Sequence, residues 1–143
     1  MTFNADLIAQ ARFAAAKHSL DPALVCAVVE QESSWDPNAI RYEPEFRTRY
    51  VSPLGLPATE EVARSISWGL MQVMGQVARE HGFTGRSLAA LCDPFSGLDI
   101  GCTVLSSKIN SAGTDTARAL KLWNGGANPK YPAQVLERLA HYR

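Results

Sequence analysis

The sequence predicts an all-α fold with little or no sheet, in which about six to eight short helices surround one buried helix. Apolar residues recur with helical spacing, Asp-Pro pairs mark two helix starts, and no segment alternates apolar and polar residues over a useful length. A length of 143 residues fits a single domain over residues 1–143. The content of 46% apolar and 20% charged residues is ordinary for a soluble globular protein.

The central helix is predicted to begin at Asp21-Pro22 and to end near Ser33. Aspartate can accept hydrogen bonds from the first helical N–H groups, and proline is tolerated at the first position because its missing N–H needs no partner there. The i, i+3, i+4 spacing of a buried face is formed by Leu24, Val25, Val28 and Val29.

Two acids stand near the end of this helix. Glu32 continues the apolar stripe, whereas Glu30 lies about 200° around the helix from it and should face outward or toward a partner. An acid on an apolar face is costly to ionise, so its pKa rises toward the range useful for a general acid. Two other interpretations stay open: Glu32 is a structural glutamate with a hydrogen-bonded partner, or the helix ends one turn earlier.

The segments before and after this helix differ in regularity. A first helix is predicted from a cap at Asn4 or Asp6 to about His18, with an inner face of Leu7, Ile8, Ala11, Ala14 and Ala15. Residues 40–64 form an irregular excursion with two short helical turns, one of them at residues 59–64. This excursion interleaves arginines with Tyr42, Phe46 and Tyr50. The mixture could line a sugar-binding cleft or form a lid that packs on itself.

The second half of the chain is again helical. An apolar turn after Gly69 leads into a helix that Gly82 terminates, and a short segment follows at residues 88–92. A longer helix is predicted at residues 93–110, with an inward stripe of Leu98, Cys102, Leu105 and Ile109. The next helix is capped by Thr114 or Asp115 and runs through residue 123, a sharp loop covers residues 124–129, and the last helix runs from residue 132 toward 142.

Charge and cysteine content narrow the function classes. With 14 basic and 14 acidic residues, there is no electrostatic case for nucleic acid or for an anionic membrane surface, and no apolar run could insert into a bilayer. Cys26, Cys92 and Cys102 form neither a disulfide framework nor a zinc pattern, although one bridge among them stays open. We therefore expect no metal and no cofactor. The first residues lack a basic region followed by an apolar one, so we expect no signal peptide in this chain.

Three separated motifs have to be considered together: QESSWDP at residues 31–37, GLMQVM at 69–74 and NGG at 124–126, with Tyr131 and Val135 just beyond. Their order and spacing resemble the soluble lytic transglycosylase (SLT domain) family of the lysozyme-like superfamily, whose members cleave peptidoglycan. The resemblance covers residues 20–142. It implies a single lysozyme-like domain. The excursion at residues 40–64 resembles compact phage endolysins and virion-associated enzymes more than large periplasmic members.

The resemblance also implies roles for individual residues. Glu32 matches the single catalytic acid/base, and Ser33 matches the serine that follows it. Gln72 and Met74 match residues that contact sugar near the scissile bond, and Asn124 matches the asparagine of the NGG loop. Tyr131 matches a tyrosine whose hydroxyl hydrogen-bonds the catalytic acid.

The sequence departs from the family pattern at two places. Leu122-Trp123 stands where the family usually has Ala-Tyr before NGG, so the aromatic ring is kept and the hydroxyl is lost. Gly97 stands where the family has an asparagine after the Asp-Pro pair.

The implied reaction is cleavage of the bond between N-acetylmuramic acid (MurNAc) and N-acetylglucosamine (GlcNAc) in peptidoglycan glycan strands, with 1,6-anhydromuramyl products. A hydrolytic muramidase resembling goose-type lysozyme is the alternative, and it needs a second carboxylate. The candidates, which we expect to be solvated surface residues, are Asp36, Glu43, Glu45, Glu60 and Glu61. A non-catalytic glycan-binding module and a structural domain of a phage tail also remain open. We expect a monomer that acts on the cell wall, in the periplasm or outside the cell.

Overall fold

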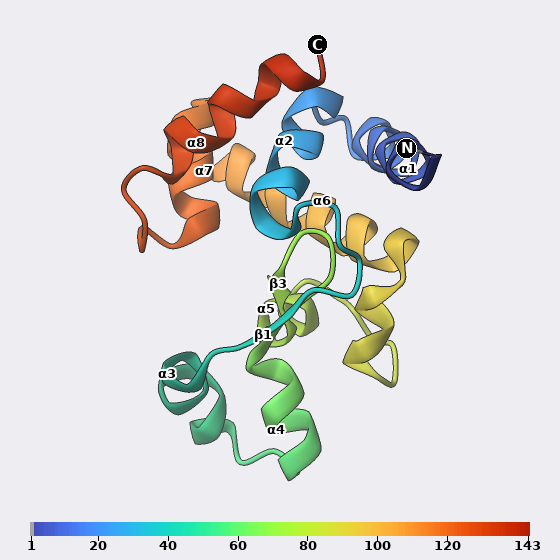
Figure 1. The fold of residues 1–143 in the computed structure, drawn as a ribbon. Helices are drawn as coiled ribbons and strands as arrows, with labels where there is room; N and C mark the ends of the chain where they lie inside the picture. Colours follow the sequence, from blue (N-terminus) through green and yellow to red (C-terminus); the bar gives the residue numbers. More distant parts are fainter. Residues whose placement is uncertain (1) are drawn as a thin grey trace.

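The computed structural model describes residues 2–143, with side chains from residue 4 onward. Its described part is mostly helical, as predicted (Figure 1). The helices in chain order are α1 (Thr2–Lys17), α2 (Pro22–Ser33), α3 (Pro44–Phe46), α4 (Ala58–Arg64), α5 (Gly75–Glu80), α6 (Pro94–Ser111), α7 (Thr116–Asn124) and α8 (Tyr131–Arg138). Four segments of 3-10 or π-helix accompany them: η1 (Arg47–Val51), η2 (Ser52–Leu54), η3 (Leu88–Cys92) and η4 (Leu139–His141).

Helix α2 is the buried helix that the sequence predicts. Asp21 caps it by accepting a hydrogen bond from the Ala23 N–H at 3.0 Å, and Pro22 occupies its first turn. The helix packs against α1 on one side and α8 on the other, and α6 crosses below it in the view of Figure 1. Val25, Val28 and Val29 are completely buried, and each such side chain contributes about 1.5–3 kcal/mol through removal from water.

Helix α1 begins earlier than predicted. It starts at Thr2, so Asn4 and Asp6 lie inside the helix and neither caps it. Packing against α2 and α6 from Leu7 onward stabilises the helix, and the exposed residues 4–6 extend it, because adding a residue to an existing helix costs less than starting one. The alanines predicted to face inward do so, since Ala11 and Ala15 are fully buried in the common core.

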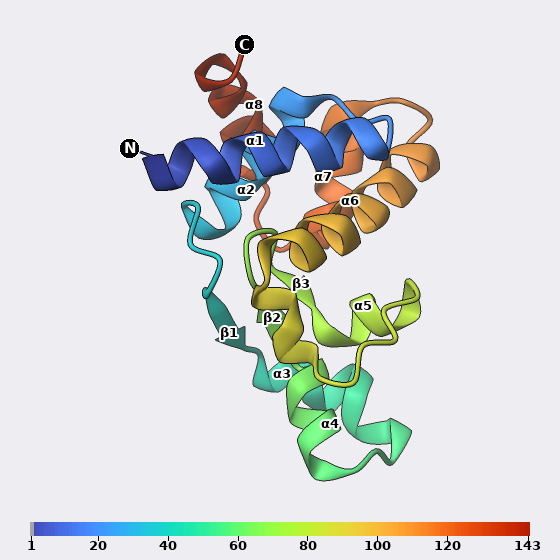
Figure 2. The same cartoon turned by 90° about the vertical axis from the view of Figure 1, so that its right-hand side faces the viewer.

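A small antiparallel sheet of order β1-β2-β3 lies below the α2 end of the molecule (Figure 2). Its strands are β1 (Ile40–Tyr42), β2 (Ile66–Trp68) and β3 (Val73–Met74). Ile40 pairs with Trp68, and Trp68 pairs in turn with Val73. The sequence did not indicate these strands because they are two or three residues long, and every residue of β1 is exposed, so no alternation exists to detect.

The excursion at residues 40–64 extends from this sheet as a separate lower part of the ribbon, with β1, α3, η1, η2 and α4 in order (Figure 1). It is more structured than predicted, although the expected turn at residues 59–64 is present as α4. Arg47 ties it together, because its guanidinium pairs with Glu61 and donates to the Tyr42 hydroxyl at 3.2 Å. The rings of Phe46 and Tyr50 also pack on each other, with centroids 5.1 Å apart.

The later helices agree closely with the prediction. Asp93 and Asp115 cap α6 and α7, and Gly82, with φ of +95°, follows the end of α5. Helix α5 follows the strands β2 and β3, which occupy most of the segment before it. No helix within residues 2–143 is both long and apolar enough to cross a membrane.

Candidate active site

Glu32 lies in the last turn of α2, immediately before a sharp change of chain direction. Ser34 and Trp35 both have left-handed backbone angles, with φ of +50° and +65°, and the Ser34 N–H donates to the Glu30 carbonyl at 3.0 Å. Trp35 is itself buried, and this fixes the turn against the core. The end of the helix therefore holds the Glu32 side chain at a defined place.

Two donors from distant parts of the chain converge on Glu32. The Tyr131 hydroxyl, at the start of α8, donates to Glu32 Oε2 at 2.5 Å. The indole N–H of Trp123, near the end of α7, donates to the same oxygen at 3.2 Å. The contact of Tyr131 with Glu32 matches what the resemblance implies, and the prediction that Glu32 belongs to a partly buried face agrees with the structure.

The environment raises the pKa of Glu32 above its ordinary value. Burial is the largest cause, and the hydrogen bonds from Tyr131 and Trp123, together with the positive charge of Arg41, oppose it. Burial and the neighbouring Glu32 also raise the pKa of Tyr131, so its hydroxyl stays protonated and continues to donate. The result is a carboxyl group that can keep its proton at a pH where an exposed glutamate has lost it.

The sheet approaches this region through a turn after β2. Gly69 has φ of +69°, and a side chain there would place its Cβ 2.5 Å from the Leu91 carbonyl oxygen, so only glycine fits. Gly97, where the family pattern has asparagine, approaches the same carbonyl oxygen equally closely. In this chain α6 therefore lies so close to the end of η3 that an asparagine at position 97 would disrupt the contact.

Gln72 stands in this turn with a left-handed backbone, φ of +53°. Its side-chain amide donates to the carbonyl oxygens of Ala39 and Gly69, both at 2.9 Å, and its Oε1 accepts from the Ser67 hydroxyl at 2.9 Å. Both amide protons are thus used to join the turn to β1 and β2. A sugar contact by Gln72 stays a prediction, and it would involve the remaining lone pair of Oε1.

Ser33, Met74 and Asn124 occupy three different elements. The Ser33 hydroxyl donates to the Val29 carbonyl at 3.1 Å, Met74 ends β3 half-buried, and Asn124 ends α7 with its amide 3.4 Å from the Asn128 carbonyl oxygen. Within residues 2–143, none of these side chains, nor Gln72, hydrogen-bonds Glu32. Their contacts to a ligand stay predictions.

The acids considered as second carboxylates are not all solvated surface residues. Glu60 is paired with Arg64 and Arg79, and Glu61 with Arg47, so the expectation of solvent exposure is wrong for these two. The reason is the fold of the excursion, which brings basic side chains to them across turns that the sequence pattern did not show. Asp36 and Glu45 are exposed, and Glu43 forms an ion pair with Arg41.

Two residues near Glu32 were not identified from the sequence as part of the site. In the sequence Trp123 is only a ring that lacks the hydroxyl of the family's tyrosine, whereas in the structure its N–H provides a second donor to Glu32. Arg41 was one of several clustered arginines, and its position on β1 became visible only with the sheet. Within residues 2–143, no group of three or more acidic, histidine or cysteine side chains could hold a metal ion, and the three cysteines are free thiols.

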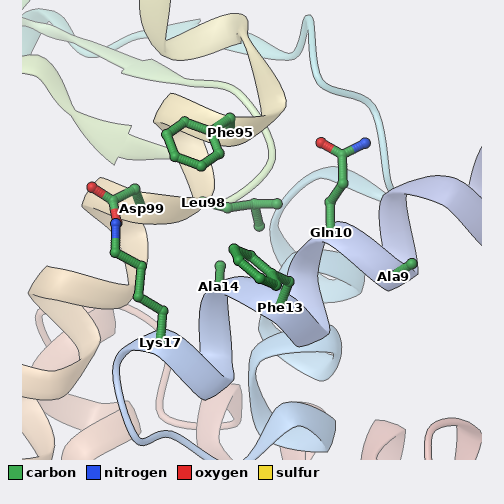
Figure 3. Close-up of a pocket in the computed structure, with 8 residues that line it drawn as sticks. All are labelled: Ala9, Gln10, Phe13, Ala14, Lys17, Phe95, Leu98 and Asp99. Atoms are coloured by element: carbon green, nitrogen blue, oxygen red, sulfur yellow. The ribbon is translucent and has the colours of Figure 1, made fainter.

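A cavity of about 240 Å³ lies apart from Glu32, between α1 and α6 (Figure 3). Phe13 and Phe95 face each other across it, and Lys17 pairs with Asp99 at one end. The lining residues are Ala9, Gln10, Phe13, Ala14, Lys17, Phe95, Leu98 and Asp99. This cavity contains none of the side chains assigned to the site.

One comparison with known proteins found a family match. The model of the transglycosylase SLT domain family matches residues 10–136, which is most of the chain. Neither a comparison with curated proteins nor one with solved structures found a match. The chain belongs to the transglycosylase SLT domain family, whose members act on peptidoglycan.

Proposed function

We propose that the protein is a peptidoglycan lytic transglycosylase that cleaves the MurNAc-β-1,4-GlcNAc bond with Glu32 as its only acid and base. The observation that carries this proposal is the environment of Glu32. Its carboxyl group is half-buried, held by two neutral donors, and forms no ion pair within the described residues. Such a group can be protonated in one step and ionised in the next.

In the first step Glu32 donates its proton to the oxygen of the glycosidic bond. The bond between that oxygen and the muramyl C1 breaks, its electron pair stays with the leaving GlcNAc oxygen, and C1 gains oxocarbenium character. The carboxylate that forms is stabilised by the hydroxyl of Tyr131 and the N–H of Trp123, because hydrogen bonds to a charged acceptor are stronger than those to a neutral one.

In the second step the C6 hydroxyl of the same muramyl residue attacks C1. Glu32 accepts the hydroxyl proton, a bond forms between O6 and C1, and a 1,6-anhydromuramyl end results. The proton that left Glu32 is thereby regained, no water is consumed, and no second carboxylate is needed. Such an enzyme would act on the cell wall, in the periplasm or outside the cell.

The surroundings of Glu32 support this route over a retaining hydrolase. A retaining enzyme needs a second carboxyl group about 5 Å from the first, and two carboxylates so close would raise one pKa strongly. Among the described residues, no acidic side chain contributes to the raised pKa of Glu32. Burial alone raises it.

Glu43 is the one acid for which a role as the second carboxylate of a hydrolase can be tested. Glu43 is bound to Arg41 at 2.9 Å, and Arg41 is the cation whose charge acts on Glu32. An inverting hydrolase tolerates a separation of about 6.5–9.5 Å between its carboxyl groups, which leaves room for a water molecule. Glu43 is therefore the residue to test for a role in activating water.

Product analysis decides between these reactions. Purified peptidoglycan is digested with the wild-type protein, and the soluble muropeptides are analysed by mass spectrometry. We expect products 18 Da lighter than the hydrolysed ones, as loss of one water in the anhydro ring requires, and unchanged products from Glu43→Gln. Reducing ends from the wild-type protein that disappear in Glu43→Gln would instead establish a hydrolase. Binding of glycan without release of any product would establish a non-catalytic module.

A further inference from the structure

The two donors at Glu32 reach the same oxygen and leave the other free. Tyr131 and Trp123 both donate to Oε2, at 2.5 and 3.2 Å. An oxygen of a carboxyl group has two lone-pair directions in the carboxyl plane, so two donors can occupy both. The Trp123 contact has one direction only, because an indole nitrogen can donate a hydrogen bond and cannot accept one.

The second oxygen of Glu32 is not sealed from solvent. Within residues 2–143, no protein group hydrogen-bonds Oε1, and no buried side-chain nitrogen or oxygen is left without a partner. Because Oε1 has no partner and is not among buried atoms, it must keep contact with solvent. The carboxyl group thus has one oxygen bound to the protein and one that is left without a protein partner and keeps some contact with solvent.

We propose that Trp123 is a positioning residue which, together with Tyr131, keeps Oε2 as the acceptor and thereby assigns the transferable proton to Oε1. This inference rests on the proposed function and specifies how the acid is set for it. A proton on Oε2 would displace one of the two donors, because the two lone-pair directions of that oxygen cannot serve three hydrogens. A proton on Oε1 leaves both hydrogen bonds intact and lies on the oxygen that has no protein partner.

The assignment gives each oxygen a separate part in the reaction. The O–H bond at Oε1 breaks as its proton passes to the glycosidic oxygen, and the negative charge that forms is shared with Oε2, where the two donors already point. Oε1 then accepts the proton of the C6 hydroxyl. The hydrogen bonds of Trp123 and Tyr131 do not have to be exchanged at any stage.

The fold holds Trp123 at this place from the end of α7. The helix ends at Asn124, and the N–H of Gly125 donates back to the carbonyls of Leu122 and Lys121. Trp123 packs against the hydrophobic core, so its ring has a fixed position. The neighbouring Leu122 is exposed, which makes it a matched control on the same turn.

The test uses Trp123→Phe, which keeps an aromatic ring and removes the N–H. Replacement of Trp123 by benzothienylalanine is a second variant, because it keeps the two-ring shape and has sulfur in place of the N–H. Leu122→Ala is the control. The pKa of Glu32 is measured directly from the side-chain carbon resonance of labelled glutamate, with Glu32→Gln to assign the signal, and folding is checked by circular dichroism. The titratable and charged groups that act on Glu32 are Tyr131 from α8 and Arg41 from β1, and both remain in every variant.

We expect the pKa of Glu32 to rise by about 0.5–1 unit in both Trp123 variants, since each loses one donor to the carboxylate. The basic limb of the rate profile should move to higher pH by the same amount, and kcat should fall about tenfold with little change in KM. Leu122→Ala should match the wild-type protein in all these measurements.

The outcomes separate this inference from the proposed function. A folded Trp123 variant with an unchanged Glu32 pKa would overturn the positioning role, whatever its activity. An inactive wild-type protein would overturn the proposed function, and the resonance titration would still report whether Trp123 acts on Glu32. A fall in kcat without a shift of the basic limb of the pH–rate profile would mean that Trp123 has only a packing role. That result would also contradict the inference.

Discussion

Glu30 and Glu32 stand two residues apart on one helix, and each is held by a tyrosine that arrives from the C-terminal part of the chain. Tyr142 donates to Glu30 at 2.6 Å and Tyr131 donates to Glu32 at 2.5 Å. A tryptophan accompanies each tyrosine: Trp35 donates to the Tyr142 hydroxyl at 2.8 Å, and Trp123 donates to Glu32 itself. The two carboxyl groups therefore have similar neutral partners.

The two carboxyl groups differ in how deeply they are buried and in their contacts with cations. Glu30 also forms an ion pair with Arg138 and lies 3.0 Å from His141 Nδ1. Burial opposes its ionisation, but these contacts and the Tyr142 hydroxyl outweigh burial and lower the pKa of Glu30. Glu32 has no direct cation contact among the described residues, so burial prevails and its pKa is raised. Deeper burial and the absence of a bound cation within the described residues together make Glu32 the carboxyl group that can carry a proton.

The largest expected effect is loss of activity in Glu32→Gln. This change keeps the shape and the hydrogen-bonding ability of the side chain but removes the transferable proton, so peptidoglycan cleavage should fall by at least about 1,000-fold. Glu30→Gln is the matched control, because it makes the same chemical change two residues away. Release of soluble muropeptides is the measurement. Comparable losses in both variants, or retained activity in Glu32→Gln, would contradict the separate roles.

A smaller effect is expected when the tyrosine hydroxyls are removed. Tyr131→Phe takes away the shortest hydrogen bond to Glu32, so the rate should fall by about 10- to 100-fold with the fold retained. Tyr142→Phe removes the corresponding contact to Glu30 and should affect stability more than rate. Initial rates and thermal unfolding of both variants check this. An unchanged rate in Tyr131→Phe would mean that Tyr131 is only packed.

The positions of these residues explain how far the sequence could predict the site. Glu32 was predicted because the helical period places it on the same face as Val28 and Val29, and a period is a local property. The contact of Tyr131 with Glu32 joins residues 99 positions apart, and only the family resemblance indicated it. The Trp123 contact could not be predicted, because it depends on where the last turn of α7 packs.

For the fold, the sequence could not predict the short strands or the turn that contains Gln72. The helix caps at Asp21, Asp93 and Asp115 are local signals, and the structure has all three. The left-handed backbone of Gln72 is stabilised by carbonyl groups of Ala39 and Gly69, and one of these lies 33 residues away. Because glutamine usually avoids the left-handed conformation, its presence at position 72 does not predict that conformation from the sequence.

The smallest effect, and the one that separates the two glutamates most directly, is on stability. The pKa of Glu30 is lowered in the folded state, so its charge contributes stability above its unfolded pKa of about 4.5, and this contribution is lost as the pH falls through the lower folded value. The pKa of Glu32 is raised, so its ionisation costs stability as the pH rises from about 4.5 through the higher folded value.

At pH 7 we therefore expect Glu30→Gln to lower the free energy of unfolding by about 1–3 kcal/mol, and Glu32→Gln to raise it by about 1 kcal/mol or less. Urea unfolding at pH 7 and below pH 4 measures both, and both differences should shrink at the lower pH, because the carboxyl groups are then increasingly protonated in folded and unfolded chains alike. A loss of stability in Glu32→Gln at pH 7 would show that the Glu32 carboxylate stabilises the fold and is a structural group like Glu30.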